Sequence, residues 1–189
     1  LESMPVHATV EERLDALCLP DQMRGQSNVA MIPPRLVVNC PHLWDFVFQP
    51  AALGLAQQLL GSLPTVTDIS AWWSFGGAAA AREAQLFHLD FDDHRFCKLF
   101  LYLSDVDEGH GPHVYAKRTQ DTAYIAQRRA AFPGGDAAFD SWFRQKLRKE
   151  DAEVARYLDP ELAVMTGPAG TVFMANTKGV HKGLLPRDG

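Results

Sequence analysis

The chain has 189 residues, of which 47% are hydrophobic and 22% are charged, and its formal net charge is -5 at pH 7. This composition is ordinary for a folded globular protein and far from that of a disordered chain. A negative chain is a poor match for nucleic acid, which usually binds a basic face, and no apolar run approaches the roughly 18 residues that span a membrane. We therefore expect neither a nucleic-acid partner nor a membrane-spanning helix.

The N-terminal sequence and the cysteines predict a cytoplasmic protein. The start, LESMPVHATVEERL, lacks the basic residues followed by an apolar stretch that mark a signal peptide. Cys18, Cys40 and Cys97 are odd in number and widely spaced, which is typical of reduced thiols rather than disulfides. The length favours a single domain over residues 1–189, and the sequence leaves the oligomeric state undetermined.

Residues 1–64 are predicted to form a helical supporting region. Thr9 and Glu12 make a capping box, and the helix that it opens is expected to run to about Leu17. A proline-rich connection, MIPPRL, and an aromatic segment, HLWDFVFQ, come next. Pro50 is predicted as the first residue of the helix PAALGLAQQLL, which Gly61 ends.

Residues 65–119 and 164–189 carry the pattern of short strands. Segments rich in β-branched and aromatic residues predict strands in TVTDISAWWSF, QLFHLD, FCKLFLYLSDV, HVYA, GTVFMAN and VHKGLL. Residues 120–163 form a predicted helical insertion between them. Short strands without regularly alternating helices argue against a doubly wound parallel sheet. They favour a mainly β fold with peripheral helices, either a sandwich or a double-stranded barrel.

The stretch QLFHLDFDDHR, residues 85–95, contains the strongest candidate for a functional site. In a strand, residues i and i+2 project from the same face, so His88 and Asp90 would present an imidazole and a carboxylate side by side. The best third ligand is His181, in a late strand that could pair beside the first. Two histidines and one carboxylate leave positions of a metal ion open, as in non-haem Fe(II) oxygenases. We therefore predict His88, Asp90 and His181 as metal ligands and catalytic residues.

Other residues of this region compete for the same role. Asp92 and His94 share the strand parity of His88 and Asp90, but the sequence DDHR is typical of a turn, so Asp92, Asp93 and His94 are predicted to lie at the rim. The pair His110 and His113, in EGHGPHVY, is more simply explained by a turn that enters a strand. A second interpretation of the spacing is that the histidine and the aspartate only form a hydrogen bond with each other and bind no metal.

Three segments together resemble the phytanoyl-CoA dioxygenase family: QLFHLD, KLFLYLSDVDEGHGPHVYAK and GPAGTVFMANTKGVHKG. The resemblance covers roughly residues 65–189. It implies a double-stranded β-helix, also called a jelly roll or cupin-like barrel, with Fe(II) bound by His88, Asp90 and His181. It further implies a 2-oxoglutarate-dependent dioxygenase that hydroxylates a small organic substrate, with succinate and carbon dioxide as co-products. The chain departs from the family after the hairpin, where YAKRTQ replaces a Pro-Gly-Ser-His-like turn.

The resemblance leaves the anchor of the co-substrate open. The family usually holds the distal carboxylate of 2-oxoglutarate with an arginine that follows the last histidine, and the expected position lies beyond Gly189. A dicarboxylate in an apolar barrel requires a cationic partner. Arg187 shares the parity of His181, although Pro186 lies between them, and Lys98 lies on the strand after the H-x-D pair. Lys98 and Arg187 are therefore the candidates, and Lys98 is equally well explained as an edge-strand lysine in water.

The substrate pocket and two alternative functions complete the expectations. Trp73, Phe100 and Tyr102 are candidates to line a pocket for an apolar substrate, although aromatic strand residues more often form a core. The same barrel and ligands would serve a cupin-like metalloenzyme that does not use 2-oxoglutarate. They would also serve a non-catalytic barrel that binds a metal or a ligand.

Overall fold

The structure is a computed structural model, and it describes residues 29–187. Contacts divide the chain into two compact units, residues 1–78 and 79–189, and each is described by itself. The helix expected from Thr9 to about Leu17 lies outside the described residues. No helix within the described range is long and apolar enough to cross a membrane.

The described part of the first unit contains short helices and a two-stranded sheet. In chain order, its elements are β1 (Val29–Met31), α2 (Pro34–Val38), α3 (Pro41–Val47), α4 (Pro50–Leu60) and β2 (Trp72–Ser74). Each helix begins with a proline, whose missing N–H costs nothing at the first helical position. Helix α4 ends at Gly61, which takes a left-handed φ of 73°, so the predicted helix and both of its ends are confirmed.

The strand predicted in TVTDISAWWSF is much shorter than expected. Only Trp72–Ser74 forms a strand, and it pairs antiparallel with β1, with Ala30 opposite Trp73. A strand extends only as far as a neighbour supplies hydrogen-bond partners, and β1 has three residues. The aromatic segment HLWDFVFQ also differs from a plain connection, because most of it forms helix α3.

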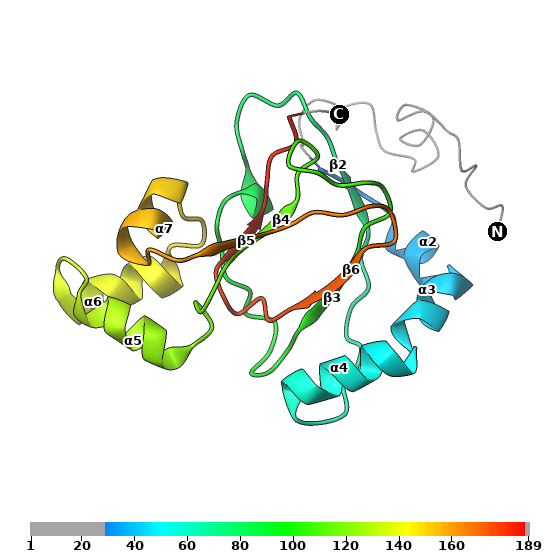
Figure 1. Cartoon of the computed structure of the whole chain (residues 1–189), viewed down its shortest axis with the longest axis horizontal. Coiled ribbons are helices and arrows are strands. Elements are labelled where there is room, and N and C mark those ends of the chain that lie inside the picture. The colour runs from blue at the N-terminus through cyan, green and yellow to red at the C-terminus, as the bar shows by residue number, and fades with distance from the viewer. Residues whose placement is uncertain (1–28, 188–189) are drawn as a thin grey trace. The chain divides into compact units, whose positions relative to one another are not determined.

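Two small antiparallel sheets form the centre of the second unit (Figure 1). Strand β3 (Lys98–Leu101) pairs with β6 (Val172–Ala175). Strand β4 (His113–Ala116) lies between β5 (Leu162–Met165) and β7 (His181–Gly183). The segments FCKLFLYLSDV, HVYA, GTVFMAN and VHKGLL therefore contain strands, as predicted.

The segment QLFHLD was predicted as a strand but forms only two isolated bridges. It follows a short 3-10 turn, η2 (Glu83–Gln85), and pairs Phe87 with Lys149 and His88 with His181. Beyond His88 the chain leaves the line of β7, since the next backbone hydrogen bond runs from Asp90 N–H to the carbonyl of Thr177. The pairing is thus too brief for a continuous strand, although it still places His88 beside His181.

The helical insertion expected over residues 120–163 is present. It comprises α5 (Thr122–Ala130), α6 (Gly135–Asp140), the π-helical turn η3 (Ser141–Gln145) and α7 (Asp151–Tyr157), which lie together in Figure 1. Asp121 caps α5 by accepting hydrogen bonds from two backbone N–H groups. The aromatic residues of the insertion share one hydrophobic core with the strands, formed by Phe87, Val114, Ala116, Phe139, Trp142, Phe143, Val154, Leu158 and Val180.

Helices and sheets are mixed in this chain, with about 33% helix and about 19% strand. The expectation of a mainly β fold is therefore corrected, because the supporting helices hold more of the chain than the short strands do. The described strands form separate sheets and no closed barrel. A jelly-roll arrangement stays a prediction.

Successive side chains of strand β4 point to opposite faces of its sheet, and only one of these faces packs into the hydrophobic core. Val114 and Ala116 are buried in the hydrophobic core, so His113 and Tyr115 project to the opposite side. Tyr115 pairs with His181 across the sheet, and His181 is bridged to His88. Cross-strand partners share a face, so these side chains lie on one surface, opposite the face that packs against the helical insertion.

Candidate metal centre

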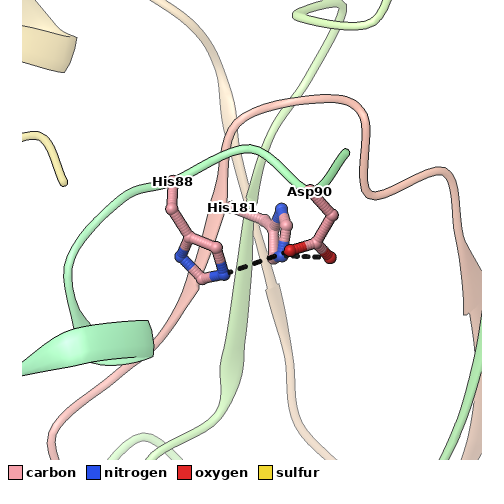
Figure 2. Close-up of side chains that lie close together, drawn as sticks. All are labelled: His88, Asp90 and His181. Carbon is pink, nitrogen blue, oxygen red and sulfur yellow. Dashed lines mark ion pairs between the residues drawn. The ribbon is translucent and has the colours of Figure 1, made fainter. Parts of the chain in front are cut away.

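His88, Asp90 and His181, the triad, come together in the second unit, as predicted (Figure 2). One potential ligand atom from each residue lies within 4.8 Å of the others. Nε2 of His88 is 3.8 Å from Oδ1 of Asp90, and Nε2 of His181 is 3.4 Å from Oδ2. Figure 2 shows both rings directed toward the carboxylate.

Backbone pairing is what brings the triad together. His88 and His181 exchange two backbone hydrogen bonds, of 2.9 and 3.0 Å, and their ring centroids lie 4.2 Å apart. Asp90, two residues after His88, projects to the same side, and its N–H donates to the carbonyl of Thr177 at 3.0 Å. Main-chain contacts between segments that are far apart in the sequence thus fix His88 and Asp90 relative to His181.

Both imidazole rings are oriented by carbonyl groups on their far side. Nδ1 of His88 lies 2.9 Å from the carbonyl oxygen of Leu86, and Nδ1 of His181 lies 2.9 Å from that of Gly179. A carbonyl oxygen only accepts, so each Nδ1 carries a hydrogen, and Nε2 is the ring nitrogen that can offer a lone pair to a metal ion. Both Nε2 atoms face the carboxylate of Asp90. A metal cation at this place would be bound by all three groups.

The charges of the triad agree with this arrangement. Burial, followed by repulsion from His181, lowers the pKa of His88 to about 4, so that ring is neutral at pH 7. Burial alone would raise the pKa of Asp90, but the neighbouring side chains of His181 and Lys98 outweigh it and hold this pKa well below its usual range. A neutral imidazole and an ionised carboxylate are the forms that bind metal ions.

The donor set fits a single divalent metal ion. Nitrogen and oxygen ligands bind such ions at about 2.0–2.2 Å, so two ligands at right angles lie about 3 Å apart. The separations of 3.4 and 3.8 Å are slightly wider than that, and modest side-chain rotations would close them. The hydrogen bonds to Nδ1 provide the outer support that metal-binding histidines usually have.

Lys98 lies beside the triad but is already paired. Its Nζ is 2.7 Å from Oδ2 of Asp90 and 2.9 Å from Oδ2 of Asp92. Burial would lower the pKa of Lys98, but these two carboxylates outweigh it and raise the pKa. The two carboxylates that pair with Lys98 thus come from the same sequence stretch that carries the ligands. Its proposed contact with a co-substrate stays a prediction.

The polar residues that follow the ligands in this stretch, residues 92–95, are exposed. Asp92 pairs with Lys98, and the side chain of Asp93 accepts the backbone N–H of His94. Neither Asp93 nor His94 belongs to the triad, which agrees with their predicted position in a turn. His110 is also exposed and lies 2.8 Å from Oδ1 of Asp107, as expected for the turn before β4.

Aromatic side chains from both sheets lie next to the triad. The Phe100 ring stacks on Phe173 at 4.9 Å, and Tyr102 meets Phe173 edge-on at 5.4 Å. The His113 ring lies 4.8 Å from Phe100 and 5.4 Å from His181. The ring of His113 thus connects Phe100 to His181, and Phe173 connects Tyr102 to His113. The role of Phe100 and Tyr102 as pocket residues stays a prediction.

Sequence reasoning missed the position of His113. Its motif was assigned to a turn entering a strand, and His113 is indeed the first residue of β4. Its place beside His181 depends on the register of β4 against β7, in which His113 pairs with Gly183. The sequence offers only one hint, which is that His113 and Tyr115 share a parity opposite to the apolar Val114.

Two predicted residues are not brought to the triad by any described contact. Arg187 is exposed, and its guanidinium donates to the carbonyl of Glu108 at 3.4 Å. Trp73 belongs to the first unit, where it pairs with Ala30. Their roles in co-substrate and substrate binding stay predictions.

Comparisons with protein-family models, with curated proteins and with solved structures found no match to this chain. Any function proposed for it therefore rests on the geometry of the triad and on the resemblance of its sequence.

Proposed function

We propose that the chain is a non-haem Fe(II)- and 2-oxoglutarate-dependent oxygenase that hydroxylates a small organic substrate. The observation that carries this proposal is the triad, in which two Nε2 atoms and one carboxylate converge while a carbonyl oxygen orients each ring from the Nδ1 side. Two histidines and one carboxylate leave several positions of an octahedral ion open for a co-substrate and oxygen. The resemblance to the phytanoyl-CoA dioxygenase family adds the co-substrate and the type of reaction.

The arrangement of the second unit supports the fold that this proposal includes. Two antiparallel sheets contribute residues to the same site, with Phe100 on β3 and His113 on β4 in ring contact. Sheets that meet across an internal site are the geometry of a jelly roll. We therefore include a double-stranded β-helix in the proposal.

The residues of the chain have separate tasks in such a reaction. A bound Fe(II) ion would supply the activation of oxygen, coupled to decarboxylation of 2-oxoglutarate, that hydroxylation of a C–H bond requires. His88 and His181 would hold the ion through Nε2, and Asp90 would offset part of its charge. Phe100 and Phe173, whose rings stack and also contact the His113 ring, would supply apolar surface that limits the access of water to the reacting groups.

One observation favours a second candidate, a cupin-like metalloenzyme that does not use 2-oxoglutarate. Lys98 is the cation beside the triad, and Asp90 and Asp92 already occupy it. A dicarboxylate would have to compete with these two carboxylates for its partner, whereas an enzyme without a dicarboxylate co-substrate needs no such cation. A non-catalytic metal-binding barrel would bind the ion and turn over nothing.

The test is an anaerobic titration of the protein with Fe(II) and then 2-oxoglutarate, followed by visible absorption. The proposal expects one Fe(II) per chain and a metal-to-ligand charge-transfer band when 2-oxoglutarate is added. Fe(II) binding without this band would favour the second candidate. Absence of stoichiometric metal binding would contradict both.

Matched variants make the result specific to the triad. His88→Ala should lose Fe(II) binding, because a facial site cannot hold the ion tightly with two ligands. His94→Ala removes an exposed histidine of the same stretch and should leave binding unchanged. Equal loss in both variants would show that the stretch acts through its fold rather than through the ligands.

A further inference from the structure

His113 is a buried histidine whose ring has an unused nitrogen. Its side chain lies on the same face of the sheet as His181, and the residue is only 8% exposed. Nε2 is covered and has no hydrogen-bond partner among the described residues. His88 and His181 differ in this respect, because a carbonyl group orients each of their rings.

The backbone of His113 is hydrogen-bonded, whereas Nε2 of its ring has no hydrogen-bond partner among the described residues. The N–H of His113 donates to the hydroxyl of Tyr102 at 3.0 Å, and that hydroxyl donates to the carbonyl of Met165 at 2.7 Å. The ring lies between Phe100, at 4.8 Å, and His181, at 5.4 Å. Packing and backbone contacts thus fix the position of the ring without satisfying Nε2.

An unsatisfied nitrogen at this place is costly. A buried polar group without a partner costs about 1–3 kcal/mol, and a phenylalanine would fill the same aromatic wall without that cost. Packing alone therefore does not account for a histidine at this position. The neighbours of His113 indicate where a partner for its ring would lie. The ring contacts the triad residue His181 on one side and Phe100 on the other.

We propose that His113 is a positioning residue whose ring N–H donates a hydrogen bond to a carboxylate oxygen of a small organic acid bound beside the triad. This inference rests on the proposed function, because the acid would occupy the positions of the ion that the triad leaves open. The chemistry of the site selects a carboxylate. A divalent ion held by the triad would supply the positive charge for an anionic oxygen, and the His113 ring, which contacts His181 and Phe100, would supply the hydrogen-bond donor.

The test compares wild-type protein with His113→Phe and His113→Gln. Fe(II) affinity is measured first under anaerobic conditions, and the affinities for 2-oxoglutarate, succinate and acetate are then measured calorimetrically on the loaded protein. His113→Phe should keep wild-type Fe(II) affinity and bind the carboxylates that the wild type binds at least tenfold more weakly. His113→Gln, which keeps a donor, should recover part of the loss. The exposed His110→Phe is the control and should match the wild type.

Thermal unfolding without metal separates a positioning role from a structural one. His113→Phe should be at least as stable as the wild type, since it removes an unsatisfied polar group. A large fall in its melting temperature, or wild-type affinity for every carboxylate in the variant, would overturn the inference.

The outcomes distinguish this inference from the proposed function. If loaded wild-type protein binds succinate or acetate through His113 but does not bind 2-oxoglutarate, the inference holds and the proposed co-substrate is wrong. If 2-oxoglutarate binds equally to wild type and His113→Phe, the function holds and the inference fails. If the loaded wild type binds none of the three acids, both fail.

Discussion

The carbonyl oxygen of Gly179 orients the ring of His181, and Gly179 itself lies tightly against Tyr115. A Cβ added at Gly179 would lie 2.0 Å from the hydroxyl of Tyr115 and 2.6 Å from its Cζ. That hydroxyl donates to the carbonyl of Asn176 at 2.8 Å, so it is not free to move away. The absence of a side chain at position 179 is therefore part of how the triad is built.

We predict that Gly179→Ala lowers the free energy of unfolding by about 1–3 kcal/mol, the usual effect of forcing extra volume into a packed region. It should also weaken Fe(II) binding, because the carbonyl that holds Nδ1 of His181 must shift. Gly183→Ala is the matched control, since an added Cβ there meets nothing within 4 Å. Denaturant unfolding and Fe(II) titration of both variants measure the effects, and equal behaviour of the two would contradict this explanation.

Residue-scale prediction from the sequence succeeded where strand parity was sufficient. His88 and Asp90 were found because they are two residues apart, and His181 because it lies in a late strand. The pairing of Lys98 with Asp90 and Asp92 was not predicted, because the sequence suggests for this lysine either a co-substrate carboxylate or water. The place of His113 could not be predicted, since it depends on a cross-strand register that the sequence does not encode locally.

At the scale of elements, one ion pair links the helical insertion to the strand that carries His181. Lys182 is only 6% exposed, and its Nζ lies 2.6 Å from Oδ1 of Asp151 at the start of α7. The same Nζ is 4.6 Å from the centre of the Phe87 ring. A buried cation depends on its partner, so this contact couples α7 to β7.

We predict that Asp151→Asn lowers the free energy of unfolding by about 1–3 kcal/mol, because it leaves the charge of Lys182 buried and unpaired. The double variant Asp151→Asn, Lys182→Met should lie closer to the wild type than the single variant does. Asp159→Asn is the control, as its pair with Arg128 is at the surface and worth under about 1 kcal/mol. Chemical denaturation provides the values, and a double variant less stable than Asp151→Asn would count against the coupling.

The elements themselves were predictable to different degrees. Helix α4 was found with both ends because Pro50 and Gly61 are strong local signals. Strand β4 coincides with HVYA, whereas QLFHLD and TVTDISAWWSF have strand-like composition but few hydrogen-bond partners. Strand length is set by the neighbour rather than by the segment, and local sequence does not reveal the neighbour.

At the scale of the whole molecule, a lysine is enclosed in the shared core. Lys149 is 0% exposed, and its Nζ donates to the carbonyl of Lys146 at 2.8 Å, with the ring of Trp142 at 5.6 Å. Burial lowers the pKa of Lys149 from 10.5 to about 8. The unfolded chain therefore binds a proton more readily than the folded one between these two values.

This difference predicts how stability depends on pH. Where the unfolded state holds more protons, the free energy of unfolding rises with pH, so Lys149 should add about 1–3 kcal/mol between pH 8 and 10.5. Lys149→Met lacks this contribution. The free energy of unfolding of the wild type, minus that of the variant, should therefore rise with pH across that range when both are measured by denaturant unfolding. A flat or opposite trend would show that Lys149 keeps an ordinary pKa and stays protonated in the folded protein.

Succinate formation by the iron-loaded protein tests the proposed function most directly. Wild-type protein supplied with Fe(II), 2-oxoglutarate and oxygen should release succinate, whereas Asp90→Ala should keep its fold, judged by circular dichroism, and release none above background. Asp93→Ala, which removes an exposed carboxylate of the same stretch, should behave like the wild type. Undiminished succinate formation in Asp90→Ala would contradict the assignment of the triad as the catalytic metal centre.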